Sequence, residues 1–332
     1  MRGRNWTFLS ALAAASLAAG CAGESTPEPG SSPQDVTLPD PGPDGFQIGT
    51  DMIDVPAGAE TQQCYFFEVP FDRPVDVHRI TLAQNTGSHH MNVFRVKSVV
   101  ALDGAPGDVV KDGECWKGPN WADWPIVANS QSSGEEDWEL PEGVALKLAP
   151  REKLMLQSHY VNATTQTTPT HGKGLVNFYG LPEGSQTEEL GTLFATNQLI
   201  EICPGNPAPQ FSSTCPLAKE GPITVIAAAG HFHSRGKRFT MNSYSSTTGA
   251  AGEQFYESTA WDEPPFARGM SVQIPMGDQI QWTCEYTPLT EGQCGDPAKN
   301  CCYTFGGLVE TQEHCNAFVY YYPRGSTDRN CF

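Results

Sequence analysis

Short apolar segments separated by turn residues are the feature that most constrains the fold of this chain. Its 332 residues include 33 glycines and 27 prolines, which favour turns and limit long helices. Between these residues, apolar and polar side chains alternate with the period of two that places one face of a strand against a core. The expected strands are residues 64–69, 91–96, 154–161, 176–179, 223–229, 271–274, 279–286 and 317–322. The pattern predicts an all-β fold of the sandwich or jelly-roll type.

Length and turn composition predict the domain organisation. A domain usually has about 100–200 residues, so a chain of 332 residues favours two domains. The turn-rich stretch 180–185 offers a boundary between them. We therefore predict two consecutive antiparallel jelly-roll domains, over residues 46–185 and 186–332.

The N-terminus has the features of an export signal. Arg2 and Arg4 precede an apolar run that ends in Leu-Ala-Ala-Gly-Cys at Cys21, and small residues directly before a cysteine are similar to a bacterial lipobox. We expect a lipoprotein signal peptide over residues 1–20, acylation of Cys21 and a disordered tether over residues 21–45. The alternative is an ordinary secretory signal with an incidental cysteine. The lipobox predicts a protein anchored by lipid alone to a bacterial membrane, on the periplasmic or cell-surface side of the outer membrane.

Charge and cysteine content limit the partners and the compartment. The chain has 38 acidic and 20 basic side chains, so it lacks the broad basic surface that nucleic-acid binding needs. Removing Cys21 from 11 cysteines leaves ten, an even number that allows five disulfides in an oxidising compartment. Open pairings are Cys64 with Cys115, Cys203 or Cys215 with Cys331, and local pairs among Cys294, Cys301 and Cys302.

Six of the eight histidines fall in short motifs within β-like segments: His89, His90, His159, His231, His233 and His314. His231 and His233 are two residues apart and share one strand face, and Gln157 shares a face with His159. The adjacent pair at 89–90 needs a strand end or a bulge before both rings can bind one ion. Three imidazoles with an open position make a reactive metal site, so we predict metal binding. The alternative is a set of unrelated, hydrogen-bonded buried imidazoles.

The order of these motifs resembles the copper type II, ascorbate-dependent monooxygenase family. The motifs are Ser-His-His-Met at 88–91, Leu-Gln-Ser-His-Tyr at 156–160, His-Phe-His at 231–233, Glu-His-Cys-Asn at 313–316 and three tyrosines at 320–322. The resemblance implies two jelly rolls, each with one copper, and a solvent-filled cleft between the metals. The implied ligands are His89, His90 and His159 for the electron-transfer copper, and His231, His233 and His314 for the oxygen-binding copper. A disulfide between Cys284 and Cys315 is also implied.

Three positions depart from the family pattern. His314 stands where the family has a methionine ligand, and imidazole favours Cu(II) over Cu(I), so the potential of the second copper should be lower. Three histidines with an open position also fit catalytic zinc. Ala229 and Phe318 stand where peptide-amidating members have an arginine and a tyrosine, which removes the anchors for a peptide carboxylate. A small, less polar, non-peptide substrate is expected instead.

The sequence therefore predicts an exported monooxygenase that uses two coppers, O₂ and an external reductant such as ascorbate to hydroxylate a C–H bond. Residues expected beside the metals or the substrate are Gln157, Ala229, Asn316 and Phe318. One alternative is a non-catalytic copper-binding or electron-transfer surface lipoprotein, and another is a zinc-dependent hydrolase.

Overall fold

The structure is a computed structural model that describes residues 36–97, 103–115, 124–162, 170–185, 187–309, 311–326 and 329–331. The predicted signal peptide, Cys21 and most of the predicted tether lie outside these residues. Residues 35–332 form one compact unit, and the predicted domain boundary near residue 185 stays a prediction. Within the described ranges, no helix combines the length and apolarity that crossing a membrane requires.

Regular structure in the described residues is almost entirely β, which confirms the all-β prediction. Each of the eight expected segments coincides largely with one strand. In the described residues, two short 3-10 helices interrupt the strands, η1 (Asp112–Glu114) and η3 (Pro297–Lys299). The strands up to residue 189 are β1 (Phe46–Gly49), β2 (Ile53–Val55), β3 (Glu60–Glu68), β4 (Val75–Gln84), β5 (Ser88–Arg95), β6 (Val109–Lys111), β7 (Ile126–Ser130), β8 (Gly134–Glu139), β9 (Val144–Leu148), β10 (Lys153–Val161), β11 (Thr170–Gly172), β12 (Gly174–Gly180) and β13 (Glu188–Glu189).

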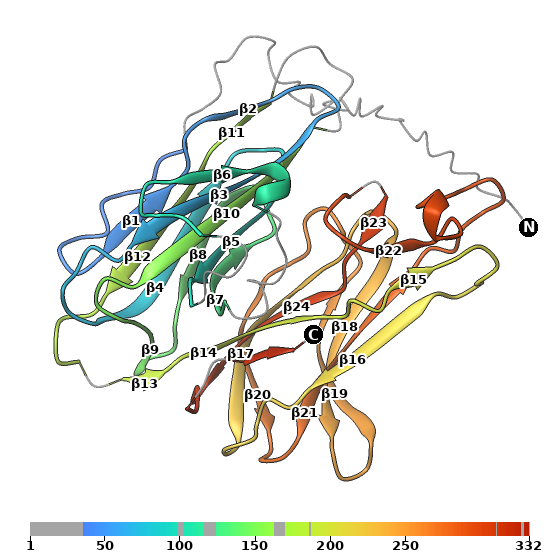
Figure 1. Cartoon of the computed structure of the whole chain (residues 1–332). Coiled ribbons are helices and arrows are strands. Elements are labelled where there is room, and N and C mark those ends of the chain that lie inside the picture. Colours follow the sequence, from blue (N-terminus) through green and yellow to red (C-terminus); the bar gives the residue numbers. More distant parts are fainter. Residues whose placement is uncertain are drawn as a thin grey trace, which may run out of the picture. The chain divides into compact units, whose positions relative to one another are not determined.

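The remaining strands follow the residue-185 region and appear from yellow to red in Figure 1. They are β14 (Gly191–Thr196), β15 (Glu201–Ile202), β16 (Gln210–Cys215), β17 (Ile223–His231), β18 (Gly236–Ser245), β19 (Ala250–Ser258), β20 (Ala267–Ile274), β21 (Gln279–Tyr286), β22 (Tyr303–Phe305), β23 (Gln312–Glu313), β24 (Asn316–Tyr322) and β25 (Arg329–Cys331).

Four larger sheets carry most of the fold. The first two have the orders β1-β12-β4-β9-β13, with β8 also paired to β4, and β6-β3-β10-β5-β7. The next two have the orders β20-β17-β24-β14-β25 and β16-β21-β18-β19. Two small sheets, β11-β2 and β15-β22-β23, complete the set. We call the second sheet the β5 sheet and the third the β24 sheet, because these two position the candidate site.

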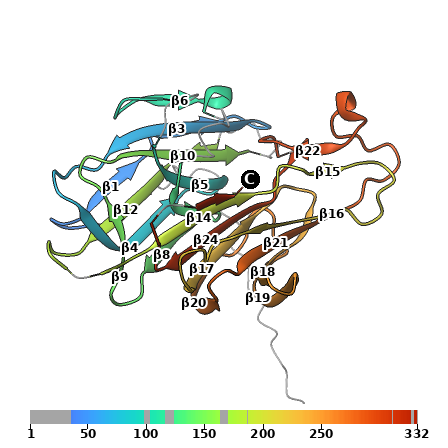
Figure 2. The ribbon, with the colours of Figure 1, turned by 60° about the horizontal axis from the view of Figure 1, so that its bottom comes forward.

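The β24 sheet contributes to two hydrophobic cores, one on each face. Phe194, Phe318 and Tyr320 pack into a core formed mainly by residues before 185. Their strand neighbours Leu193 and Val319 pack into a second core with the β16-β21-β18-β19 sheet. Strands alternate their side chains, so one sheet can face both cores. Figure 2 shows β14, β24 and β17 between β5 on one side and β21 and β18 on the other.

This succession of packed sheets corrects one prediction. We expected two separate jelly-roll sandwiches, but the sheets are arranged more like the blades of a five-bladed propeller. The physical reason lies in β17 and β24, whose residues are buried on both faces. A central strand with two apolar faces needs a sheet against each of them.

Five disulfides join all ten cysteines that follow Cys21. Cys284–Cys315, the pair implied by the resemblance, is among them. The other four are Cys64–Cys115, Cys203–Cys302, Cys215–Cys331 and Cys294–Cys301. Such dense pairing is typical of exported proteins, because oxidising compartments preserve disulfides.

Candidate metal centre

A β-bulge at His89 brings two adjacent histidines into one cluster. His159 on β10 pairs with His90 on β5, and the next residue, Tyr160, pairs with Ser88. His89 is therefore the extra residue, and a bulge of this kind re-aims a side chain that would otherwise face the opposite side. The centroids of the His89 and His90 rings lie 5.2 Å apart. Of the two arrangements that would let both rings bind one ion, a strand end or a bulge, the structure has the bulge.

Hydrogen bonds fix which nitrogen faces inward in two of the rings in this part of the cluster. The Nε2 atom of His90 lies 3.3 Å from Gln157 Oε1, and the Nε2 atom of His159 lies 2.7 Å from Glu60 Oε1. The Nδ1 atom of each ring has no hydrogen-bond partner among the described residues. A partner on one nitrogen of an imidazole orients the other toward a metal. His90 and His159 would thus bind through Nδ1.

The second part of the cluster lies where β17 ends and β24 begins. His231 is the last residue of β17 and pairs with Asn316, the first residue of β24. The His314 ring lies 5.3 Å from that of His231 and 4.3 Å from that of His233, centroid to centroid. Hydrogen bonding of His233 Nδ1 to the Gln312 carbonyl at 3.0 Å leaves its Nε2 for a metal.

The Glu313 side chain holds this second part in place. Its carboxylate accepts the backbone N–H groups of His233 and Arg235 at 2.9 and 2.8 Å. Burial raises the pKa of Glu313 to about 8. On the other side of the motif, the Tyr286 hydroxyl donates to the His314 carbonyl at 2.6 Å, and the adjacent Cys315 is bonded to Cys284. The His-Cys-Asn motif is therefore fixed by bonds on both sides.

The two parts of the cluster are contiguous. The His231 ring lies 4.9 Å from His89 and 5.1 Å from His90, centroid to centroid. Candidate ligand atoms lie within 4.8 Å of one another in two groups, one of His89, His90 and His231 and one of His231, His233 and His314. His159 is beside the first group, 4.8 Å from the His90 ring. The expected solvent-filled cleft is absent between these described rings, because the β24 sheet packs directly against the β5 sheet.

Burial favours the uncharged form of five of these six rings. All six are at most 5% exposed, and burial, reinforced by neighbouring imidazoles, lowers the pKa of His89, His90, His231 and His314 well below the usual value. Burial also lowers the pKa of His233 to about 4. A neutral imidazole offers a lone pair, and a buried nitrogen without a hydrogen bond is costly. The donor set therefore fits a metal that accepts imidazole, such as copper or zinc. The assignment of particular ligands to each copper stays a prediction.

A cavity of about 80 Å³ borders the cluster between the β5 and β24 sheets. His90, His231 and His314 form one end of it, and Gln157, Asn316 and Phe318 lie in its wall as expected. Ala229 is fully buried and pairs with Phe318 across β17 and β24, behind that wall.

Sequence reasoning missed Glu60, Gln131 and Thr196. Glu60 begins the polar run Glu-Thr-Gln-Gln before Cys64, which could have signalled a strand with a ligand-orienting carboxylate. Gln131 directly follows β7 and Thr196 ends β14. These two strands were not predicted, so no pattern placed either side chain near the histidines.

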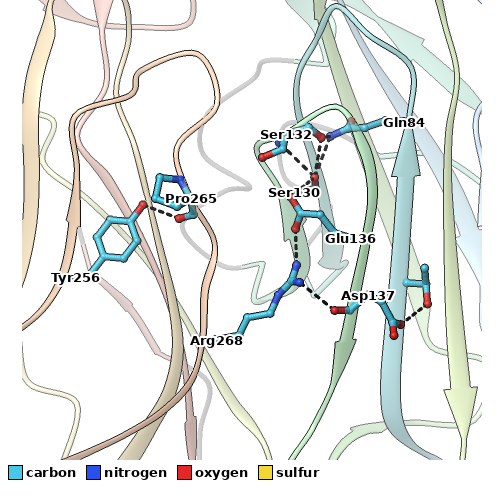
Figure 3. A network of polar contacts seen from close by, with 9 residues as sticks. Gln84, Ser130, Ser132, Glu136, Asp137, Tyr256, Pro265 and Arg268 are labelled. Carbon is cyan, nitrogen blue, oxygen red and sulfur yellow. Dashed lines mark hydrogen bonds and ion pairs between the residues drawn. The ribbon is translucent and has the colours of Figure 1, made fainter. Parts of the chain in front are cut away.

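A polar network joins β20 of the β24 sheet to β8 of the first sheet (Figure 3). Arg268 donates to the Glu136 carboxylate and, at 2.9 Å, to the Asp137 backbone carbonyl. Ser130 donates to the other oxygen of Glu136 and accepts a hydrogen bond from Gln84. The Arg268 and Glu136 side chains are 25% and 13% exposed. The pair therefore ties the β24 sheet to β8 of the first sheet, and Ser130 at the end of β7 links Glu136 to the β5 sheet.

Replacing Arg268 with glutamine should destabilise the fold. Burial raises the pKa of Glu136 even beside the guanidinium, so loss of Arg268 leaves a carboxylate in poorly solvated surroundings. Hydrogen bonds to charged groups contribute about 1.5–3 kcal/mol, and the free energy of unfolding in urea should fall by that amount. Arg79→Gln is the control, because its ion pair with Asp137 is 40% and 43% exposed and should contribute about 0–1 kcal/mol. Equal losses in the two variants would contradict this role.

Comparisons with known proteins agree with the site. Residues 187–332 match the family described as copper type II ascorbate-dependent monooxygenase, C-terminal domain. A tyramine beta-hydroxylase of Caenorhabditis briggsae is 24% identical over 310 residues, which cover 82% of this chain and 47% of that protein. The chain thus spans about half the length of this curated relative.

Solved structures give only weak similarity. N-glycanase F (PNGase F) aligns over 86% of this chain and 98% of its own, with a TM-score of 0.39 and 10% identity. The PBSX exported protein XepA covers 76% of this chain and 89% of its own, with a TM-score of 0.21 and 7% identity. Both TM-scores are too low to establish a shared fold. The match over residues 187–332, together with the ordered histidine motifs, relates the C-terminal part of this chain to the copper type II, ascorbate-dependent monooxygenase family.

Proposed function

We infer that this protein is a copper-dependent monooxygenase that hydroxylates a C–H bond of a small non-peptide molecule. The observation that carries the proposal is the convergence of six buried imidazoles in one cluster, three of which, His90, His231 and His314, line a cavity beside it. In the reaction, one oxygen atom of O₂ enters the C–H bond and the other leaves as water. An external reductant of the ascorbate class supplies two electrons, and two protons complete the balance.

The chain's own residues would prepare the site. His231, His233 and His314 would hold one copper. His89 and His90, with His159 beside them, would hold the other, and His231 lies close enough to His89 and His90 to serve that site as well. Bound copper would supply the redox chemistry that O₂ reduction requires. Glu60, Gln157 and the Gln312 carbonyl orient three of the rings, which saves reorganisation during the reaction. Burial of the cluster keeps bulk water away from the reacting atoms.

The activity for which one relative is named supports the reaction class. That relative is named for hydroxylation of tyramine, which agrees with a small-molecule substrate. In this chain Phe318 and the buried Ala229 leave no cation at the two positions where peptide-amidating members hold a carboxylate. A lipid-anchored location through Cys21 is proposed with the function and would be tested by mass spectrometry of the mature N-terminus.

Oxygen consumption tests the proposal directly. Copper-loaded protein should consume O₂ with ascorbate when a suitable small aromatic or aliphatic substrate is present, and the rate should fall to background without copper. An oxygen electrode measures the rate, and mass spectrometry with labelled O₂ locates one oxygen atom in the product. No substrate-dependent consumption by fully copper-loaded protein across a broad panel would overturn the proposal.

Replacing His314 with methionine should raise the reduction potential of the copper that it binds. A thioether favours Cu(I), whereas imidazole favours Cu(II). A redox titration followed by electron paramagnetic resonance should therefore show easier reduction in the variant. His171→Met, at a partly exposed imidazole paired with Asp54, should leave the potential unchanged. A lower or equal potential in the His314 variant would show that His314 does not bind the metal.

A non-catalytic copper-binding lipoprotein is the second candidate. His314 in place of a methionine ligand favours it, because three imidazoles hold Cu(II) tightly. Copper bound in the 2+ state without turnover would select this function. Zinc without copper in protein from its native host would instead select a hydrolase.

A further inference from the structure

Aromatic side chains form much of the wall of the cavity beside the histidine cluster. Alternate residues of β5, His90, Asn92 and Phe94, face the β24 sheet across it. Phe194 and Phe318 stack on the opposite side with centroids 5.3 Å apart, and Phe94 meets Phe194 edge to face at 6.2 Å. Aromatic walls of this kind bind flat apolar groups.

The size of the cavity suits a small organic molecule. Its volume is about 80 Å³. Measured in the same way, the space that one water molecule needs is roughly 10–15 Å³. It can therefore hold the equivalent of several waters, which is enough for one aromatic ring with a short polar chain.

Polar atoms in the wall are neutral, and several have no hydrogen-bond partner among the described residues. Gln131 is 1% exposed and both atoms of its carboxamide are unpartnered. Gln157 Nε2, Thr196 Oγ1 and Asn316 Oδ1 are buried and unpartnered as well. Buried polar groups are almost always satisfied by a partner or a ligand. These side chains therefore offer both donors and acceptors to a bound molecule.

No acidic or basic side chain lies in the described lining, and the three histidines there are buried. Gln157 is already tied into a carboxamide chain, since its Oε1 accepts from Asn92 Nδ2 at 3.1 Å and Asn92 Oδ1 accepts from Asn129 Nδ2 at 3.0 Å. A charged ligand would lose its hydration without meeting an opposite charge.

We propose that this cavity binds a neutral aromatic molecule with an amide or hydroxyl group, and that Gln131 is the residue that selects it. The proposal rests on the proposed function, because the bound molecule is then the substrate of the neighbouring metal site. A preference for a neutral molecule would distinguish this chain from the relative that is named for its action on tyramine, an amine. Gln131 is a specificity residue in this proposal, because it lines the cavity and its carboxamide forms no hydrogen bond with a candidate metal-binding ring in the described residues.

The test compares three molecules of nearly equal shape: phenylacetamide, phenylacetate and phenethylamine. Isothermal titration calorimetry on the copper-loaded full chain, and on the same chain stripped of metal, should show phenylacetamide binding at least about tenfold more tightly than either charged molecule. Gln131→Leu should weaken phenylacetamide binding about tenfold, the loss expected for one buried hydrogen bond. Gln131→Glu should shift the preference to phenethylamine.

Two further variants keep the outcome interpretable. Thr196→Val preserves shape and should also weaken phenylacetamide binding if Gln131 variants fold poorly. Gln273→Leu, on the exposed side of β20, should leave all three affinities unchanged. Preference for a charged molecule, or no binding of any of the three, would overturn the cavity assignment. Selective phenylacetamide binding by a chain that consumes no O₂ with any substrate would overturn the proposed function instead.

Discussion

Replacing His231 with alanine should lower copper affinity more than any other single substitution in the cluster. His231 belongs to both groups of closely spaced donor atoms, one with His89 and His90 and one with His233 and His314. Loss of a residue that merely orients a ligand costs about 10–100-fold in metal affinity. Loss of a shared ligand should therefore exceed about 100-fold, as measured by competition with a chromophoric chelator, and the copper content per chain should fall.

Two other histidine variants provide the comparison for this loss of copper affinity. His159→Ala should have a smaller effect, because His159 lies outside both groups of donor atoms. His171→Ala should bind copper like the natural protein, since its ring is partly exposed and bonded to Asp54. Equal losses for His231 and His159, with one copper retained in each variant, would instead favour two independent sites.

Removing the Cys215–Cys331 disulfide should cause the largest loss of stability among the disulfides that we compare. The bond joins the end of β16 to β25 across 116 residues of sequence. The loop-closure relation gives about 5 kcal/mol for such a loop. The double variant Cys215→Ala with Cys331→Ala should show this decrease in the free energy of unfolding, measured with guanidinium chloride.

The Cys294–Cys301 disulfide is the matched comparison. It spans only 7 residues of sequence, for which the same relation gives about 2.5 kcal/mol. The double alanine variant at these positions should therefore lose about half as much. A loss as large as that of the Cys215–Cys331 variant would show that constraint of the unfolded chain does not set the effect.

The sequence was sufficient for the strands with strong alternation and for the histidines. The 223–229 and 317–322 segments became β17 and β24 because apolar residues dominate both of their faces. The bulge at His89 was also predictable, since two adjacent rings can converge only where the period of two is broken.

Other features depend on contacts that a one-dimensional pattern does not contain. β14 and β18 have mixed polarity, and their strand character comes from pairing with β24 and β21. The two histidine groups lie close together because the β24 sheet packs on the β5 sheet. The local sequences of β5 and β24 do not specify that packing. The same holds for Glu60, which reaches His159 from the neighbouring strand β3.

Because the β24 sheet is buried on both faces, the choice of boundaries for an expressed fragment is restricted. A fragment beginning at residue 187 would expose Phe194, Ile226, Phe318 and Tyr320, which the intact chain covers with its first half. An apolar surface of that kind drives self-association in water. The region that matches the family is therefore not a self-sufficient folding unit, and truncated versions for crystallisation or fusion should keep everything from β1 to β25.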